Sequence, residues 1–189
     1  MDRNKRPQKV ALINLARAND ARIELGLLLD DAAEAGAVYE RRSGLETQTA
    51  FELVERTAAL ASHEAVVLGL DLGDASFDEA LAALDEGTMV YVVLSCGDNP
   101  AEQALGVLSI FGEICDERGL VWGGGIAVAH SQVVAAFEQA PRLGFWRRAT
   151  SSAIDELLLR IRCGEEAGNI PARQGWLRRA AAAIVLRLR

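Results

Sequence analysis

The stretch that decides the fold is TMVYVVLS at residues 88–95, in which six consecutive apolar side chains are flanked by Thr88 and Ser95. A strand with one solvent-exposed face alternates polar and apolar residues, whereas a continuous apolar run of this length indicates a strand covered on both faces. We therefore expect a buried strand here and in three similar runs. These are residues 9–16 (KVALINLA), 64–71 (EAVVLGLD) and 120–129, the last of which contains three consecutive glycines.

Longer amphipathic segments separate these runs, and their apolar residues recur at the spacing of a helix. Gly36 and Gly119 are typical of residues that end a helix, and Pro100 suits the first helical position. A short, charged segment at residues 37–41 predicts a fifth strand near an edge of the sheet. The predicted helices cover residues 21–36, 47–62, 77–85, 100–118, 131–139 and 146–162.

Strands that alternate with helices are typical of a parallel sheet with right-handed crossovers and helices on both faces. The sequence therefore predicts an α/β fold, a three-layer sandwich around a five-stranded parallel sheet with strand order 2-1-3-4-5. This is the flavodoxin-like order, in which the ligand crevice lies beyond the carboxyl ends of the strands. We assign this domain to residues 1–170 and a basic, helical C-terminal extension to residues 171–189.

The charge of the chain is uneven. Its net charge is −7, but residues 171–189 contain five arginines and no acidic residue, which leaves −12 on the preceding 170 residues. This acidity argues against nucleic acid as a partner. We expect the basic helix to pack on the acidic body of its own chain or of a second copy, in a homo-oligomer. An acidic membrane surface is the alternative.

The three cysteines, Cys96, Cys115 and Cys163, are an odd number at wide spacing, which suits neither a disulfide framework nor a zinc site. We therefore expect no metal, and reduced thiols in a cytoplasmic protein. The apolar stretches fall short of the ~18 residues that a membrane span requires, so we expect no span. The N-terminal residues lack the apolar core of a signal peptide.

The loops that follow the strands carry the candidate binding residues. After the first strand, Arg17, Asn19 and the amino end of the next helix could hold a phosphate through backbone N–H groups. This loop contains no glycine, serine or threonine, and Asp20 adds an acid where a phosphate would sit. The alternative is an ordinary helix start, in which Asn19 or Asp20 caps the helix.

Cys96 is the candidate nucleophile. It falls between a strand end and the start of a helix, a position that lowers the pKa of a thiol. His130 is expected at the same edge, where Asp71 or Asp74 could orient it as a base. A partly buried, unreactive thiol is the alternative for Cys96.

The glycine run at residues 123–125 is not a dinucleotide-binding fingerprint, which belongs directly after the first strand. The run indicates that the backbone passes close to something bulky, either a ligand or a neighbouring helix. Trp122 beside it could face a flavin or a partner, or lie in the core.

Residues 88–162 resemble the C-terminal half of flavodoxin-like proteins related to NAD(P)H-dependent FMN reductases. The features that carry the resemblance are the strand TMVYVVLS, the loop CGDNPAEQAL, a helix that ends in ERGL and the strand-turn VWGGGIAVAH. The resemblance implies an FMN site at the carboxyl ends of the strands. By position, it implies that the flavin-contacting residues are Arg17, Ala18 and Asn19 for the phosphate, Gly73 and Asp74 in the second loop, and Ser95, Cys96, Gly97, Asp98 and Asn99 beside the ring.

Two of these loops depart from the family pattern, since the phosphate loop lacks the usual Ser and Thr and residues 71–75 lack the usual Pro and aromatic side chains. One interpretation is an FMN-dependent oxidoreductase that takes a hydride from NAD(P)H and passes electrons to a small acceptor. The cofactor carries that chemistry, so no protein acid or base is required. The other is a cofactor-less, dimeric flavodoxin-like module for binding or regulation. A hydrolase or transferase based on Cys96 is a third alternative.

Overall fold

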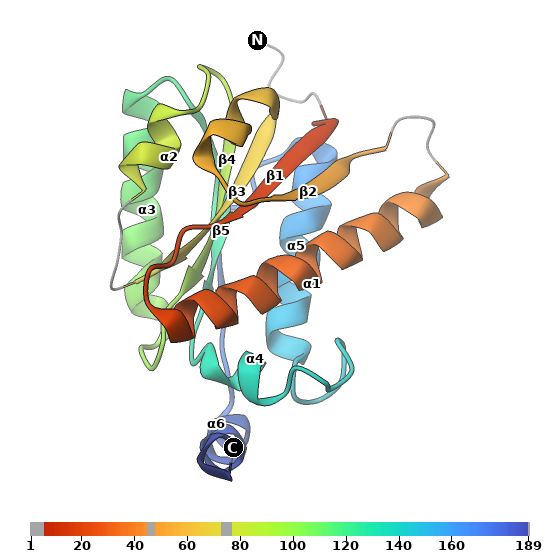
Figure 1. Ribbon diagram of the computed structural model, residues 1–189, viewed down its shortest axis with the longest axis vertical. Helices are drawn as coiled ribbons and strands as arrows, with labels where there is room; N and C mark the ends of the chain where they lie inside the picture. Colours follow the sequence, from red (N-terminus) through yellow and green to blue (C-terminus); the bar gives the residue numbers. More distant parts are fainter. Residues whose placement is uncertain (1–5, 45–47, 73–76, 189) are drawn as a thin grey trace.

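In the computed structural model, which describes residues 6–44, 48–72 and 77–188, the strands form one parallel sheet in the order β2-β1-β3-β4-β5-β6 (Figure 1). The prediction of an α/β, three-layer fold with a parallel sheet is confirmed. The predicted strand count is wrong, because a sixth strand extends the sheet beyond β5. The strands are β1 (Lys9–Asn14), β2 (Ala50–Val54), β3 (Ala65–Asp71), β4 (Met89–Ser95), β5 (Val121–Val128) and β6 (Asn169–Ala172).

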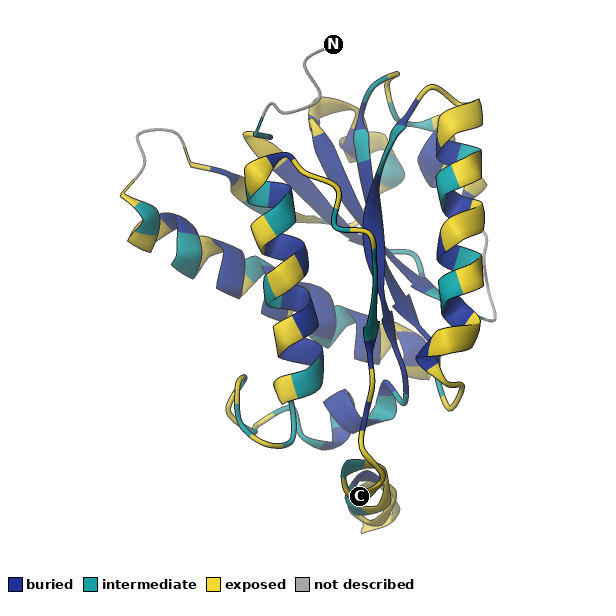
Figure 2. Cartoon of the chain, turned by 180° about the vertical axis from the view of Figure 1, so that it is seen from behind, coloured by how far each residue is buried: buried dark blue, intermediate teal, exposed yellow. Residues whose placement is uncertain are grey.

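Helices cover both faces of the sheet, and its central strands are buried between them (Figure 2). α1 (Asn19–Ser43) and α5 (Arg148–Cys163) pack on one face, and α2 (Asp78–Ala82) and α3 (Ala101–Glu117) pack on the other. In β3, Val67 belongs to the first core and Val66 and Leu68 belong to the second, which explains why the strand is apolar throughout. The described chain also forms η1 (Thr57–Ser62), α4 (Gln132–Ala136) and α6 (Trp176–Leu188).

The region between α1 and β3 differs from the prediction. α1 runs through Gly36 and residues 37–41, the segment predicted as a strand, and ends at Gly44, whose φ of 64° suits glycine. Gly36 is a contact point, because a Cβ there would lie 2.5 Å from the Phe51 ring of β2. β2 and η1 occupy the predicted helix at 47–62, and β2 takes the edge position expected of the second strand.

Ion pairs explain why the charged end of α1 is not an edge strand. The buried Glu40 pairs with Arg6 and, at 2.5 Å, with Arg162 of α5. Further along α1, the buried Asp31 pairs with Arg142 at 2.7 Å. A buried carboxylate is tolerated only with such partners. The buried acids Asp31 and Glu40 therefore tie α1 to neighbouring segments, while Arg41 and Arg42 near its end face solvent.

The glycine run of β5 lets the backbone pass close to its neighbours. The register with β4 shifts between Val90 and Tyr91, so that Tyr91 pairs with Gly124 and Gly123 is an extra residue. A Cβ on Gly123 would overlap the Tyr91 ring, and one on Gly124 would overlap the backbone of Gly168. The bulky neighbours of the glycine run are therefore β4 and the segment that leads into β6. The sequence alone is compatible with a ligand or a helix in this role.

Trp122 lies at the amino end of β5, away from the carboxyl edge of the sheet. It is half-buried and packs near Phe111 of α3, with ring centroids 6.5 Å apart. A Cβ on Gly112 would approach its ring to 3.1 Å. These contacts place Trp122 against the second core, which was the alternative to a flavin-facing position.

The C-terminal segment contributes a strand as well as a helix. β6 crosses the proposed boundary at residue 170 and pairs with β5 as an edge strand, a position that tolerates its Pro171. α6 packs on α4 through Ala182 and Val185, so the expected contact with the body is limited to one side of the helix. No helix in the described part of the chain is long and apolar enough to cross a membrane.

Replacing Gly124 with alanine is expected to lower the free energy of unfolding by about 2–4 kcal/mol, because the new Cβ meets Gly168 and the residue must keep a positive φ. Gly106→Ala in α3 is the control, since nothing lies within 4 Å of its Cβ position; alanine should raise the same free energy by ~0.5–1 kcal/mol. Urea unfolding followed by circular dichroism measures both. Equal stability of the two variants would contradict the close approach.

Candidate functional site

The loops after β1, β3, β4 and β5 leave the same edge of the sheet, as the parallel order requires. The predicted binding residues in these loops differ in exposure. The exposed ones are Arg17, Ala18, Asn19, Asp98 and Asn99. The half-buried or buried ones are Gly97, Ser95 and Cys96. Gly73 and Asp74 lie outside the described residues.

A buried carboxyl group that the sequence patterns did not reveal lies at this edge. Glu24 of α1 is only 8% exposed and accepts a hydrogen bond from the Ser131 hydroxyl. The Ser131 Oγ lies 2.8 Å from the Ser95 Oγ, and both serines are fully buried. α1, the end of β4 and the start of α4 thus converge on one polar network. The sequence feature that could have revealed this carboxyl group is the position of Glu24 on the buried side of α1, beside Leu25 and Leu28.

The surroundings of Glu24 shift the pKa of its carboxyl group upward. Burial raises the pKa of its carboxyl above the ordinary value of 4.5, and nearby Asp20 and Asp71 raise the pKa further. Hydrogen bonds from Ser131 and Ser95 act in the opposite direction without reversing the shift. We call Asp20, Glu24 and Asp71 the carboxyl cluster.

The loop that precedes α1 is shaped by Asn14. Its Oδ1 accepts a hydrogen bond from the Ala16 amide at 3.1 Å, and its Nδ2 donates to the Arg22 carbonyl at 2.7 Å. The residue before the helix is Ala18, and no side chain caps this end. The predicted cap by Asn19 or Asp20 is therefore wrong, because both residues already lie in the first turn of α1.

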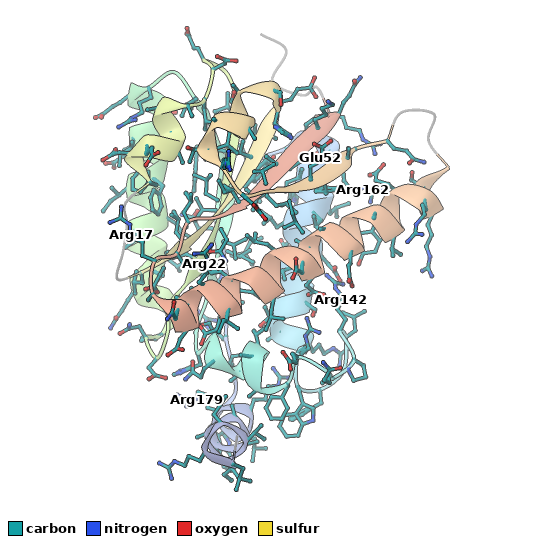
Figure 3. All side chains as sticks on the ribbon, in the orientation of Figure 1. Arg17, Arg22, Glu52, Arg142, Arg162 and Arg179 are labelled. Atoms are coloured by element: carbon teal, nitrogen blue, oxygen red, sulfur yellow. The ribbon has the colours of Figure 1, made fainter. Side chains whose placement is uncertain are left out.

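The charge of the carboxyl cluster determines whether the phosphate of FMN fits at this edge of the sheet. The phosphate of FMN is close to a dianion at neutral pH and requires cations, hydroxyls or free amides around it. The cations of this segment are Arg17 and Arg22, and Figure 3 shows Arg17 directed away from the first turn of α1. The carboxyl cluster opposes them, and the two buried serine hydroxyls are engaged in the Glu24 network. The residues present therefore do not fit the phosphate of FMN.

Cys96 is buried, and its environment disfavours the thiolate. Burial raises the pKa of its thiol to about 12, with Asp71 and Glu102 acting in the same direction. The expected lowering by the start of α3 is therefore wrong. The sulfur donates a weak hydrogen bond to the Leu94 carbonyl at 3.8 Å. A Cys96 nucleophile receives no support, and the alternative of an unreactive thiol agrees with this environment.

His130 links the loop after β4 to α6. Its Nδ1 lies 3.8 Å from Asp98 Oδ1, and its Nε2 lies 3.1 Å from Arg179 Nη1. Burial and Arg179 lower the pKa of the ring, so the neutral imidazole can accept from the guanidinium. The acid beside its ring is thus Asp98 and not Asp71, and Asp74 lies outside the described residues. The φ of 50° at His130 marks a strained backbone at this edge.

A hollow of about 270 Å³ lies at the opposite, amino-terminal edge of the sheet, lined by residues 61–64 and 85–88. His63 beside it is buried, with Nδ1 at 3.0 Å from the Ala59 carbonyl and Nε2 at 3.3 Å from Glu52. These partners account for His63 as a structural residue. Within residues 6–44, 48–72 and 77–188, no three His, Cys, Asp or Glu side chains group closely enough to hold a metal ion.

The Glu24→Gln variant is expected to gain stability over the wild type as the pH rises. The folded-state pKa of Glu24 lies above 4.5, so the unfolded chain loses its proton first and wild-type stability falls between these two values. Glutamine keeps an acceptor for Ser131 and does not ionise. Urea unfolding from pH 4 to pH 8 measures the difference, with the exposed Glu34→Gln of the same helix as control. A constant difference across this range would contradict the raised pKa.

Alkylation of the native protein at pH 8 is expected to modify Cys163, which is exposed, much faster than Cys96. The physical reason is the buried thiol of Cys96 with its pKa of about 12. Peptide mass spectrometry after treatment with iodoacetamide measures both rates, and unfolding in denaturant should equalise them. Rapid native labelling of Cys96 would restore the nucleophile hypothesis.

No protein-family model matches the chain, and no curated protein matches its sequence.

Proposed function

We propose that the chain is a flavodoxin-like binding module that works without FMN and takes an uncharged or cationic ligand at the carboxyl edge of its sheet. The observation that carries this proposal is the buried Glu24 carboxyl, with Asp20 and Asp71 nearby, at the place where the resemblance implies a phosphate. A phosphate there would add negative charge to the carboxyl cluster. Burial makes such repulsion stronger than it is in water.

The exposed rim of the same edge supports this choice of ligand class. Asp98 and Asn99 follow β4 and are exposed, and the Gln132 amide at the start of α4 donates to Asp98 Oδ1. Carboxylates and amide oxygens accept hydrogen bonds, and an amine or amide supplies the matching donors. Ligands of open parallel sheets bind at this edge. The rim therefore suits a donor-bearing ligand better than a phosphorylated one.

An FMN-dependent oxidoreductase using NAD(P)H is the second candidate function. The observation that favours it is the start of α1, which has no side-chain cap, with Arg17 and Ala18 exposed before the helix and Asn19 exposed as its first residue. Backbone amides at such a helix start can bind an anion. This candidate requires the amides and arginines to outweigh the carboxyl cluster, which is the reason we place it second.

Titration with FMN, followed by flavin fluorescence, separates the two functions. The wild type is expected to purify colourless and to leave micromolar FMN unquenched. The Asp20→Asn/Glu24→Gln double variant removes two carboxyl groups from the edge and is expected to bind FMN or inorganic phosphate about tenfold more tightly than the wild type.

The matched control is Asp30→Asn/Glu34→Gln, which makes the same change in charge at exposed positions on the same helix. It should leave FMN and phosphate affinity at the wild-type level. A yellow wild-type protein, or wild-type FMN binding at micromolar concentration, would overturn the flavin-free function and support the oxidoreductase.

A further inference from the structure

α6 presents an apolar stripe to solvent. The side of the helix that packs on α4 carries Ala182 and Val185. Leu177, Ile184 and Leu188 are seven and four residues apart, so they share a different side of the helix. They are 51%, 61% and 83% exposed, respectively. We call these three residues the α6 stripe.

Arginines flank the α6 stripe. By helical geometry, Arg178 and Arg187 fall on opposite sides of it. The Arg178 guanidinium lies over the exposed Phe145 ring at 4.8 Å, which extends the apolar surface onto the loop before α5. Residues 171–189 contain five arginines and no acidic residue. The helix is therefore amphipathic and purely basic.

We propose that the α6 stripe docks on an anionic lipid bilayer, with α6 lying in the plane of the headgroups. Such a surface matches both the apolar and the basic side chains of the helix, because acyl chains cover the leucine and isoleucine side chains while lipid phosphates pair with the arginines. Trp176 at the start of the helix is 69% exposed, and tryptophan is typical of the boundary between headgroups and acyl chains. This proposal is independent of the ligand proposed at the carboxyl edge.

A second copy of the chain fits the stripe less well. Pairing two α6 stripes would bring together two basic helices that carry no acidic residue. Elsewhere on the body, large exposed apolar residues form no matching helical stripe. Four stand on separate elements, namely Ile23 on α1, Leu53 on β2, Ile110 on α3 and Leu159 on α5, and Leu143 and Phe145 share the loop before α5.

Most of the acidic body lies away from α6, and the exposed Asp98 approaches the helix through His130, which contacts Arg179. α6 lies at one end of the molecule, below the sheet in both Figure 1 and Figure 2, and the body extends from it in the opposite direction. Charges separated by more than the Debye length of ~8–10 Å are largely screened at physiological ionic strength. The net −12 of residues 1–170 is therefore compatible with binding through the basic end.

Co-sedimentation of the full chain with lipid vesicles tests the proposal. Vesicles of phosphatidylcholine with phosphatidylserine should bind the wild type about tenfold more strongly than phosphatidylcholine alone, and added salt should weaken the binding. Ile184→Ser/Leu188→Ser should reduce the partition coefficient by about tenfold. The matched control Ile110→Ser/Leu159→Ser removes exposed apolar side chains from α3 and α5 and should bind like the wild type.

Three results would overturn the proposal. They are no binding to either vesicle, equal binding to both kinds, or equal loss in the control variant. Sedimentation equilibrium without lipid tests the competing occupant. A wild-type dimer that Ile184→Ser/Leu188→Ser converts to a monomer, combined with no vesicle binding, would assign the stripe to a second copy.

Discussion

The buried carboxyl group of Glu24 is the constraint around which the carboxyl edge of the sheet is arranged. It accepts a hydrogen bond from Ser131, which in turn contacts Ser95, so one side chain joins α1 to the end of β4 and the start of α4. A carboxyl group at this depth must be protonated or hydrogen-bonded. Its presence determines which ligands the edge can accept, because it adds an acid to the Asp20 and Asp71 already there.

The position of Glu24 depends on how firmly α1 is held. Asp31 and Glu40, further along the same helix, pair with Arg142 and Arg162, and both carboxylates are buried. Moving α1 outward to admit an anion would break these pairs and leave buried charges without partners, which is costly. These ion pairs therefore hold α1 in place, and with it the position of Glu24 at the carboxyl edge of the sheet.

Four strands could be predicted from the sequence because burial on both faces makes them continuously apolar. The predicted position of β2 is wrong, because residues 37–41 belong to α1 and their Glu40 forms buried ion pairs, whereas a short charged segment is also typical of an edge strand. β6 has only four residues and contains Pro171, so no strand pattern marks it. Glu24 was missed because an acid on a helix is ordinarily exposed, and its serine partners are distant in sequence.

The ionisation of Glu24 in the folded protein tests the central claim most directly. The carboxyl carbon of a ¹³C-labelled Glu24 can be followed by NMR across a pH titration, with and without FMN. We expect a midpoint above 4.5 that FMN leaves unchanged. A midpoint at or below 4.5, or one that shifts on addition of FMN, would contradict a buried carboxyl group that excludes the phosphate.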